Sequence, residues 1–474
     1  MASIRARILI DLAGDTENLI DVTSRCIQAF GSYGRWANLF DYRSGFASVV
    51  LSVTDNFLVP GLEGATYRTD NLKGRRVQID TRVTLEGVDE WRCVFLGVVD
   101  RVDYTPREAD ARAAIRAVDP LAQLASQTLE LGTPPEERTG ARLSRILEAA
   151  GYEGATQIDQ GTVTCVAPTQ TTRGNALALA RQVADTEGGR LFIQQNTAAP
   201  GTLRFLQRDA PGEASLTVAD SPAGGEAAFA GYPASISDPR LVVTATRFTD
   251  GFGVEHVREN PVYVAAFGRE ELQRNLLSDA DAVESLSEWW ISIFGQPVAR
   301  LDRIDLEAHF EAPTVALSVL ELSVGSVVET RIRQPGATRA TTQLYSIDGV
   351  SWKIWVLDAA VGDVGFTGSY TLFPPPVRLY WLLGDSERGV LDSTTALAAP
   401  QRSDPGGRIW VADQLVTADR FQRVLASSRQ PIYATVAERE VGDPFPVRGQ
   451  QCVLLEDSTI RMWDGVKWRS IGRW

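Results

Sequence analysis

Short strand-like runs separated by turn sequences fill the first 118 residues, and this spacing limits the possible folds more than any other feature of the 474-residue chain. After "ASIRARILIDL" near the start come four runs rich in β-branched residues, at 47–55, 75–85, 91–104 and 111–119. Segments that favour turns lie between them, such as "LEGVDE" at 85–90. Strands of this length and spacing are typical of an antiparallel barrel or sandwich.

The composition changes after residue 118, where helix-forming sequence begins. Residues 119–131 predict one or two helical turns, and residues 133–152 predict a longer helix. Thr139 is expected to cap that helix and Gly151 to end it. Its apolar residues fall on one stripe, made of Leu143, Ile146, Leu147 and Ala150.

The stretch "LARQVADTEGGRLFI" at 179–193 predicts a helix, a double-glycine stop and a strand. We expect the helix to begin near Thr172, and Gly188 and Gly189 to end it by passing through positive φ. Its buried face would consist of Ala176, Leu177, Ala180, Val183 and Ala184. "RLFIQQ" and "TLRFLQR" then predict a hairpin, so this region forms two helices on a small sheet.

β structure is expected again from 236 to 375. Residues 240–249 and 261–268 predict strands, and one helix, capped by Ser278, runs to Gly295. "PPPVRL" at 374–379 predicts a linker into a last β-rich segment.

The fold class predicted from these patterns is mainly β and multidomain, with barrel or sandwich domains and an inserted α/β domain. The expected parts are a β domain at 1–118, the α/β insertion at 119–235, a second β domain with one helix at 236–375, and a small β-rich module at 376–474.

Charge and cysteine content exclude several classes of partner. The formal net charge is −13, and the longest basic run is "KGRR" at Lys73–Arg76, so stable binding of nucleic acid is not expected. No window holds the roughly 20 apolar residues of a membrane span, and the N-terminus lacks a signal-peptide pattern, so we expect synthesis in the cytosol. Cys26, Cys93, Cys165 and Cys452 lie far apart, which predicts free thiols rather than a zinc site or disulfides.

The inventory of catalytic residues is small. The chain has only two histidines, His256 and His309, and neither belongs to a zinc-binding or nucleophile motif. With 60 acidic residues, pairs of carboxylates arise by chance. If the chain were a glycosidase, we would expect its two facing carboxylates within 120–235. No glycine-rich phosphate loop or calcium loop is present. We therefore predict no catalytic residues, no metal and no cofactor, and a protein that is not an enzyme.

Two tryptophans near the C-terminus are the candidate ligand-binding residues. Trp463 and Trp468 flank an Asp464–Gly465 turn, and such a pair can stack on a sugar or anchor an interface. A place in the small core of that module is the alternative.

The order of the segments resembles the minor tail or tail-hub proteins of long-tailed phages and the related baseplate hub proteins. The resemblance covers residues 1–375 and rests on an ordered set of motifs. These are the opening segment 25–61, "VFLGVVDRVDY" (94–104), "RAVDPLAQLAS" (116–126), "RLSRILEAAGY" (142–152), the helix–glycine–hairpin unit 174–208, "FGQPVARLDRIDLE" (294–307), "LELSVGSVVETRIR" (320–333) and "YSIDGVSWKIWVLDAAV" (345–361).

The resemblance implies a structural protein of the virion, located at the distal tail tip and assembled in the host cytoplasm. Its β domains would be hub domains in a ring around the tail axis. A homotrimer is favoured and a hexamer is the alternative, with the distal tail ring, the tape measure and receptor-binding proteins as partners. The chain departs from the family at Ser326, where an acidic residue is frequent, and at Trp352, near which a histidine is frequent.

Two other functions stay open. The chain could be a receptor- or cell-wall-binding tail protein, with a host surface glycan bound by 376–474. Less favoured is a tail-associated cell-wall hydrolase, which would need clustered carboxylates with shifted pKa values in a cleft.

Overall fold

A computed structural model describes most of the first 373 residues and several strands beyond them. The described residues are 2–13, 19–35, 42–59, 66–67, 72–106, 111–168, 171–195, 201–208, 214–231, 235–236, 242–295, 300–333, 341–358 and 362–373, followed by the C-terminal strands named below. The chain divides into two compact units, Met1–Pro375 and Pro376–Trp474. The fold is mainly β with an α/β insertion, which confirms the predicted fold class.

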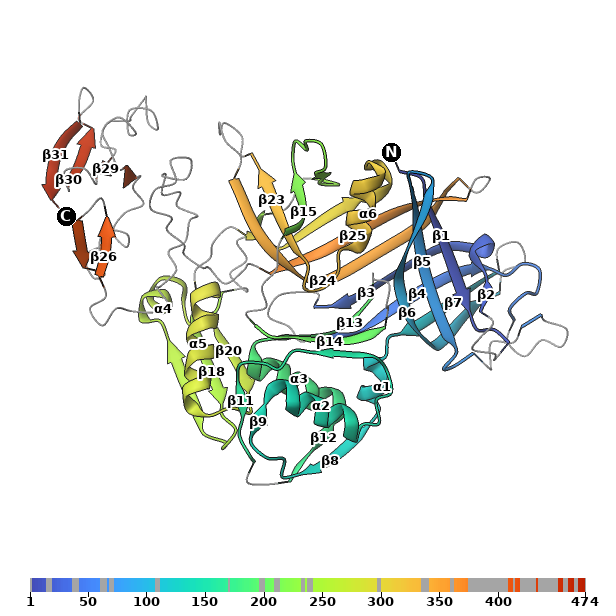
Figure 1. Ribbon diagram of the computed structural model, residues 1–474, viewed down its shortest axis with the longest axis horizontal. Helices are drawn as coiled ribbons and strands as arrows, with labels where there is room; N and C mark the ends of the chain where they lie inside the picture. The colour runs from blue at the N-terminus through green and yellow to red at the C-terminus, as the bar shows by residue number, and fades with distance from the viewer. Residues whose placement is uncertain are drawn as a thin grey trace. The chain divides into compact units, whose positions relative to one another are not determined.

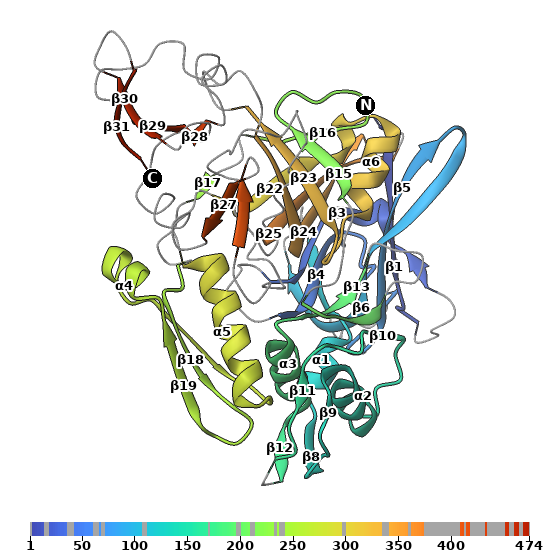
Figure 2. The ribbon, with the colours of Figure 1, turned by 60° about the vertical axis from the view of Figure 1, so that its left-hand side comes forward.

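Eight strands close into an antiparallel barrel (Figures 1 and 2). Around the barrel they are β24 (Thr341–Asp358), β3 (Cys26–Gly34), β4 (Arg43–Ser52), β7 (Arg112–Val118), β6 (Val88–Thr105), β5 (Arg76–Leu85), β1 (Ile4–Ile10) and β25 (Asp363–Phe373). The barrel closes because β25 pairs along most of its length with β24 and meets β1 at Arg5 and Asp363.

Further strands extend this sheet beyond the barrel. β23 (Val327–Ile332) pairs with the first part of β24, and β15 (Ala214–Ala219) and β16 (Ala227–Ala228) follow it. β22 (Arg303–Glu307) pairs with β25, and β2 (Ile20–Asp21) pairs with β1. Helix α6 (Pro313–Glu321) lies against β5 and β6.

Side chains fill the interior of the barrel, which is therefore a packed core and not a pore. The strands alternate, so that Ala113, Ile115 and Ala117 of β7 are buried while Arg112 and Arg116 are exposed. From α6, Val319 and Leu320 join the same core. The buried Tyr370 hydroxyl donates a hydrogen bond to the Val319 carbonyl, with an O···O distance of 2.9 Å.

The α/β insertion follows β7 and has a core of its own. Its elements are α1 (Leu121–Ala125), β8 (Thr128–Gly132), β9 (Glu137–Arg138), α2 (Thr139–Ala149), β10 (Thr156–Ile158), β11 (Thr164–Cys165), β12 (Thr172–Asn175), α3 (Ala176–Glu187), β13 (Arg190–Gln194) and β14 (Thr202–Leu206). The hairpin β13–β14 carries β10 in parallel on its outer edge. Its buried Leu191, Ile193 and Phe205 pack with α2 and α3, as the sequence predicts.

Residues 242–295 form a separate small lobe (Figure 2). It contains β18 (Ala245–Thr249), β19 (Glu255–Glu259), α4 (Pro261–Phe267), β20 (Glu271–Asn275) and α5 (Ala280–Phe294). β18 is the middle strand, with β19 antiparallel and β20 parallel to it. α5 packs on one face of this sheet, where Phe248 meets Leu286 and Phe294 in one cluster. The two-residue strands β17 (Ser235–Ile236) and β21 (Arg300–Leu301) pair with each other.

The C-terminal unit contains six described strands. β26 (Arg408–Val411) pairs with β27 (Gln414–Thr417). A second sheet has the order β28 (Ile432–Tyr433), β29 (Gln451–Leu454), β30 (Thr459–Trp463) and β31 (Trp468–Arg473).

Three helix starts differ from the prediction. Thr139 does not cap α2 but is its first residue, because its hydroxyl donates to the buried Glu187 carboxylate instead. Residues 172–175 form β12, which pairs with β8, and α3 begins after its cap Asn175. Asp279, not Ser278, caps α5 by accepting a hydrogen bond from the Ala282 amide.

Two further helices differ from the prediction: α4 replaces a predicted strand, and α6 was not predicted. Residues 261–268 are not a strand, because the Asn260 side chain accepts from the Val262 and Tyr263 amides and Pro261 occupies the first turn of α4. The helix α6 has no counterpart in the prediction. The segment 236–375 therefore contains three α-helices among its described residues, where one helix was expected.

Strands from both predicted β domains belong to a single sheet. β24 pairs with β3 across more than 300 residues of sequence, and β1 pairs with β25. The domain boundaries at residues 118 and 235 stay a prediction. The strands of 1–118 and those of 236–375 nevertheless belong to one hydrogen-bonded sheet.

Candidate assembly surfaces

The two histidines have structural partners. His256 Nε2 lies 2.9 Å from Asp250 Oδ2, and Asp250 also accepts from the Phe252 and Val254 amides, so the group fastens the β18–β19 turn. Burial raises the pKa of Asp250, but these hydrogen bonds outweigh it and leave the pKa lowered. His309 is buried in a 3-10 turn, with Nδ1 facing the Phe366 backbone.

Buried carboxylates of the α/β insertion also hold the fold together. Glu187 is fully buried and accepts hydrogen bonds from the Thr139 and Thr162 hydroxyls and from the Thr162 and Val163 amides. Within the described part of the chain, no three His, Cys, Asp or Glu residues gather as metal ligands would. None of the described helices has the length and hydropathy of a membrane span.

Asp119 titrates in a range that can be tested. It is fully buried after β7, where it accepts from the Ser44 hydroxyl and the Gly45 and Leu121 amides, and burial raises its pKa to about 7. The folded state then binds a proton that the unfolded state releases near pH 4, so the free energy of unfolding falls as pH rises from about 4 to about 7.

Asp119→Asn should remove this dependence. We expect the wild-type chain to lose about 2 kcal/mol between pH 5 and pH 7 through this group, and the variant to lose correspondingly less in urea unfolding at the two pH values. Equal losses for both chains would show that Asp119 stays ionised throughout, held by its three donors.

The candidate tryptophans are placed only by their backbone. Trp463 ends β30 and Trp468 begins β31, and the two are directly opposed in the antiparallel register. Their side chains and the Asp464–Gly465 turn lie outside the described residues. Cys93 and Cys165 are buried free thiols, as predicted, Cys26 is half-buried, and Cys452 is not described at side-chain level.

One exposed apolar surface lies along the lobe, and we call it the edge surface. It comprises five large side chains within 16 consecutive residues: Phe252, Val254, Val257, Val262 and Phe267. Val262 is 70% exposed, and α4 buries none of its residues although its sequence is "PVYVAAF". Among the described strands, β18 is the one partner of β19, so no described strand pairs with the outer edge of β19. Open edges and apolar patches of this kind are typical of docking sites.

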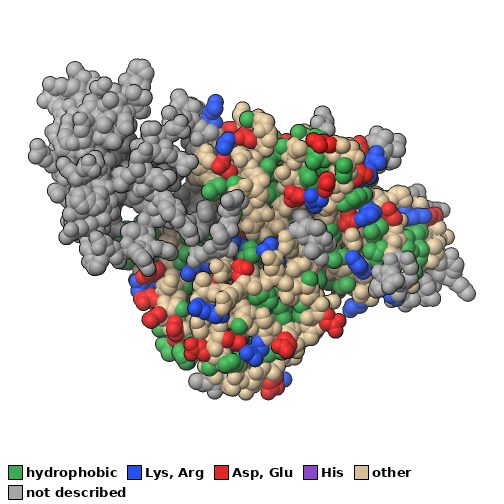
Figure 3. All heavy atoms as spheres, viewed as in Figure 1, with side chains coloured by type: hydrophobic (Ala, Val, Ile, Leu, Met, Phe, Trp, Pro, Cys, Tyr) green, Lys and Arg blue, Asp and Glu red, His purple; other side chains and the backbone are tan. Residues whose placement is uncertain are grey.

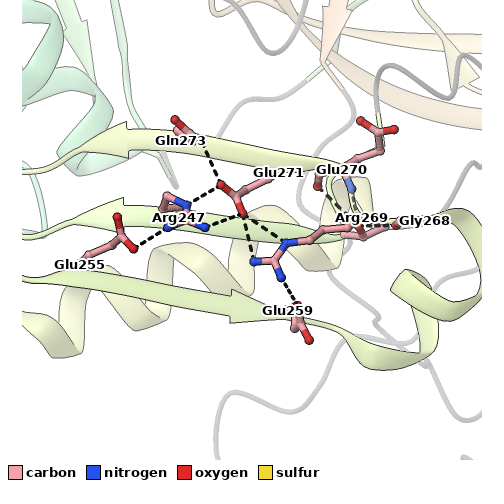
Figure 4. Close-up of polar contacts among 9 residues, drawn as sticks. Arg247, Glu255, Glu259, Gly268, Arg269, Glu270, Glu271 and Gln273 are labelled. Carbon is pink, nitrogen blue, oxygen red and sulfur yellow. Dashed lines mark hydrogen bonds and ion pairs between the residues drawn. The ribbon is translucent and has the colours of Figure 1, made fainter.

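Charged residues form a network on the sheet face away from α5 (Figure 4). Arg247 bridges Glu255 and Glu271, and Arg269 bridges Glu271 and Glu259. Hydrogen bonds from Arg247 and Gln273 lower the pKa of Glu271 to about 2. Three carboxylates face two guanidinium groups, so this face keeps a negative excess.

The lobe as a whole is acidic. Residues 242–295 contain nine acidic and four basic side chains, which gives a formal charge of −5. Acidic and hydrophobic side chains both reach the visible surface of the lobe, at the lower left of Figure 3.

The outer face of the barrel is the second candidate surface, and we call it the barrel wall. Three cross-strand rows run over β24, β3, β4, β7 and β6. They are Ser351–Ser32–Phe46–Val118–Val98, Lys353–Phe30–Ser48–Arg116–Arg101 and Trp355–Gln28–Val50–Ala114–Asp103. Phe30 and Phe46 are 37% and 43% exposed in the middle of these rows.

The barrel wall has the opposite charge to the lobe. It carries Lys353, Arg116 and Arg101 against one acidic residue, Asp103. Asp103 lies 3.1 Å from Arg101 and 3.3 Å from Arg116, measured between nitrogen and oxygen, and so cannot neutralise both. At the margin, the exposed Arg112 and Asp100 add one charge of each sign.

A buried ionic cluster ties the α/β insertion to the barrel. Asp348, in the β24 bulge, lies 2.6 Å from Arg190 Nε on β13 and 3.5 Å from an Arg35 nitrogen at the end of β3. The Arg35 guanidinium stacks on the Tyr42 ring at 4.1 Å. The hairpin of the insertion is thereby held against the barrel end.

No protein-family model and no curated protein matches the sequence. A tail protein from Neisseria meningitidis MC58 has a similar structure, with a TM-score of 0.52 and 9% identity over 78% of this chain and 97% of that one. The 43 kDa tail protein of prophage MuSo2 from Shewanella oneidensis gives 0.48 and 12%, covering 78% and 98%. An E. coli type VI secretion component described as similar to T4 tail proteins gives 0.39 and 10%, covering 74% and 73%.

The likeness to the Neisseria tail protein agrees with the resemblance to tail proteins found in the sequence. At 9% identity the likeness to the Neisseria protein shows a shared fold.

Proposed function

We propose that this chain is a structural hub protein at the distal tip of a phage tail, without catalytic activity. The observation that carries the proposal is the fold, which is shared with the Neisseria tail protein over nearly all of that protein's length. The two histidines and the buried Glu187 support it, because contacts within the fold engage each of these side chains.

The hub would form a ring at the end of the tail tube and connect it to the adsorption apparatus. The edge surface and the barrel wall supply exposed apolar area for contacts with other copies and with tail proteins such as the distal ring and the tape measure. A homotrimer is favoured and a hexamer is the alternative. Assembly in the host cytoplasm and incorporation into the virion follow from this role.

Mass measurement of the purified chain over a range of concentrations tests the proposal. We expect a closed oligomer of three copies, or of six, and labelling in phage particles should place the chain at the tail tip. A chain that stays monomeric at high micromolar concentration and degrades host cell wall would contradict the hub and favour the hydrolase.

A glycan-binding role for 376–474 is a second proposal, because the register places Trp463 directly opposite Trp468. If it is correct, the full-length chain should bind host cell wall, and Trp468→Ala should weaken binding at least tenfold. Trp410→Ala, on β26, is the matched control. Unchanged binding by the Trp468 variant would remove the tryptophan pair as the site.

A further inference from the structure

We infer that the edge surface of one copy docks on the barrel wall of the next copy. This inference depends on the proposed function only in that it requires copies of the chain to associate. It adds which two surfaces meet and that the contact joins two different patches of the chain.

The edge surface has apolar groups and backbone groups that an interface would cover. The outer edge of β19 presents amides and carbonyls with no described strand beside them. Val257 projects between Glu255 and Glu259 on the face away from α5, since Arg258 on the other face pairs with Glu284 and Glu288 of α5. Phe252 and Val254 precede β19, and α4 with Val262 and Phe267 follows it. The acidic groups of the segment, Glu255 and Glu259, lie within β19 on either side of Val257.

The barrel wall offers the complementary chemistry. Its two exposed phenylalanines have small neighbours in the register: Ser32 lies beside Phe46 and the buried Ser48 lies beside Phe30. In the row of Phe30, Lys353 is the neighbour on one side, and Arg116 and Arg101 follow beyond Ser48 on the other. A segment that carries valines and glutamates would place its apolar groups on the phenylalanines and its carboxylates near these cations.

Charge also decides which surfaces meet. Wall against wall would bring Arg101, Arg116 and Lys353 against their own copies, and lobe against lobe would oppose two bodies of formal charge −5. Edge against wall pairs opposite signs. A contact between two different patches of one chain is heterologous, and it closes into a ring when the rotation per subunit allows it.

Charge reversal on either surface tests the inference. The wall variant is Arg116→Glu with Lys353→Glu, and the edge variant is Glu255→Arg with Glu259→Arg. Each should weaken association at least tenfold in sedimentation or light scattering. The chain that carries all four changes should regain association, because the two reversed surfaces again have opposite charge.

Controls separate this contact from a general effect of charge. Arg173→Glu and Glu148→Arg make the same changes on exposed positions of the insertion and should leave association unchanged. A second measurement does not depend on the charge-reversed chains folding well. Under oxidising conditions, a mixture of Val257→Cys and Ser351→Cys chains should form a disulfide-linked dimer that neither chain forms alone.

Three outcomes would overturn the inference. If the charge-reversed chains associate like the wild type, the inference is overturned, but the hub proposal stays intact. Failure of the four-change chain to recover, with no cross-link in the mixture, would exclude the edge as the partner of the wall. DNA binding by the wall, lost in the wall variant while association stays normal, would assign the wall to nucleic acid. A wild-type chain that never associates would instead defeat the hub itself.

Discussion

Asp348→Ala is expected to lower the free energy of unfolding by about 3 to 5 kcal/mol. Asp348 is 1% exposed and forms ion pairs with both Arg35 and Arg190. Without it, the buried Arg35 and the half-buried Arg190 lose this counter-charge. Most of the cost comes from keeping a charge in the interior, away from water, without its partner. The same change also releases β13 from the end of the barrel, so the insertion should open more readily.

A surface aspartate provides the control. Asp89 in the β5–β6 hairpin accepts from Arg82 and from the Thr84 hydroxyl but is exposed, and Asp89→Ala should cost at most about 1 kcal/mol. Both are measured by urea unfolding at equal protein concentration, because association would add to stability. Adding Arg190→Met to Asp348→Ala should recover part of the loss, since one unpaired charge disappears. Equal costs for the two alanine variants would mean that water reaches the Asp348 cluster.

The helix–glycine–hairpin unit was predictable because its signals are local. α3 buries Leu177, Ala180 and Val183 on one face, as the spacing indicates. Gly188 adopts φ +65°, which is the left-handed conformation expected of a helix end. The predicted positive φ is wrong for Gly189. This position needs glycine for space, because an added Cβ would lie 2.5 Å from the Leu206 carbonyl oxygen.

The closure of the barrel was not predictable from strand patterns. β24 pairs with β3 and β25, and the first of these pairings joins residues more than 300 positions apart. It also depends on Gly31, where a Cβ would meet the Phe46 carbonyl oxygen at 2.4 Å and the Trp352 ring at 2.7 Å. The alternation of apolar and polar residues within one strand does not indicate which distant strand pairs with it.

The candidate surfaces were missed for a related reason. "PVYVAAF" is apolar and rich in valine, which favours a strand, whereas the Asn260 cap and Pro261 decide for a helix that then remains exposed. On β3, apolar residues fall on both faces, so Phe30 could not be assigned to the outside. The pair Asn-Pro before the run was the signal that could have revealed α4.

Glu187→Ala is expected to destabilise the insertion by about 3 kcal/mol, because it leaves buried donors without an acceptor. The Thr162 and Val163 amides lie 3.1 and 3.0 Å from Glu187 Oε2 and cannot turn elsewhere. The Thr139 hydroxyl, at 2.7 Å, ties the first turn of α2 to the same carboxylate at the end of α3. One side chain thus joins the two helices and the segment that leads to β11.

Hydrogen exchange shows where the loss falls. Amides of α2, α3 and 162–165 should exchange faster, while those of β4 and β7 in the barrel keep their protection, because the insertion has its own core. The protection of these amides in Glu187→Gln should lie between that of the wild type and that of Glu187→Ala. The glutamine keeps one acceptor oxygen, but its NH₂ group would face the Thr162 and Val163 donors. Glu148→Ala, at an exposed position near the end of α2, is the matched control and should have little effect. If barrel and insertion amides lost protection together in Glu187→Ala, the two cores would unfold as one, and the insertion would not be an independent cooperative unit.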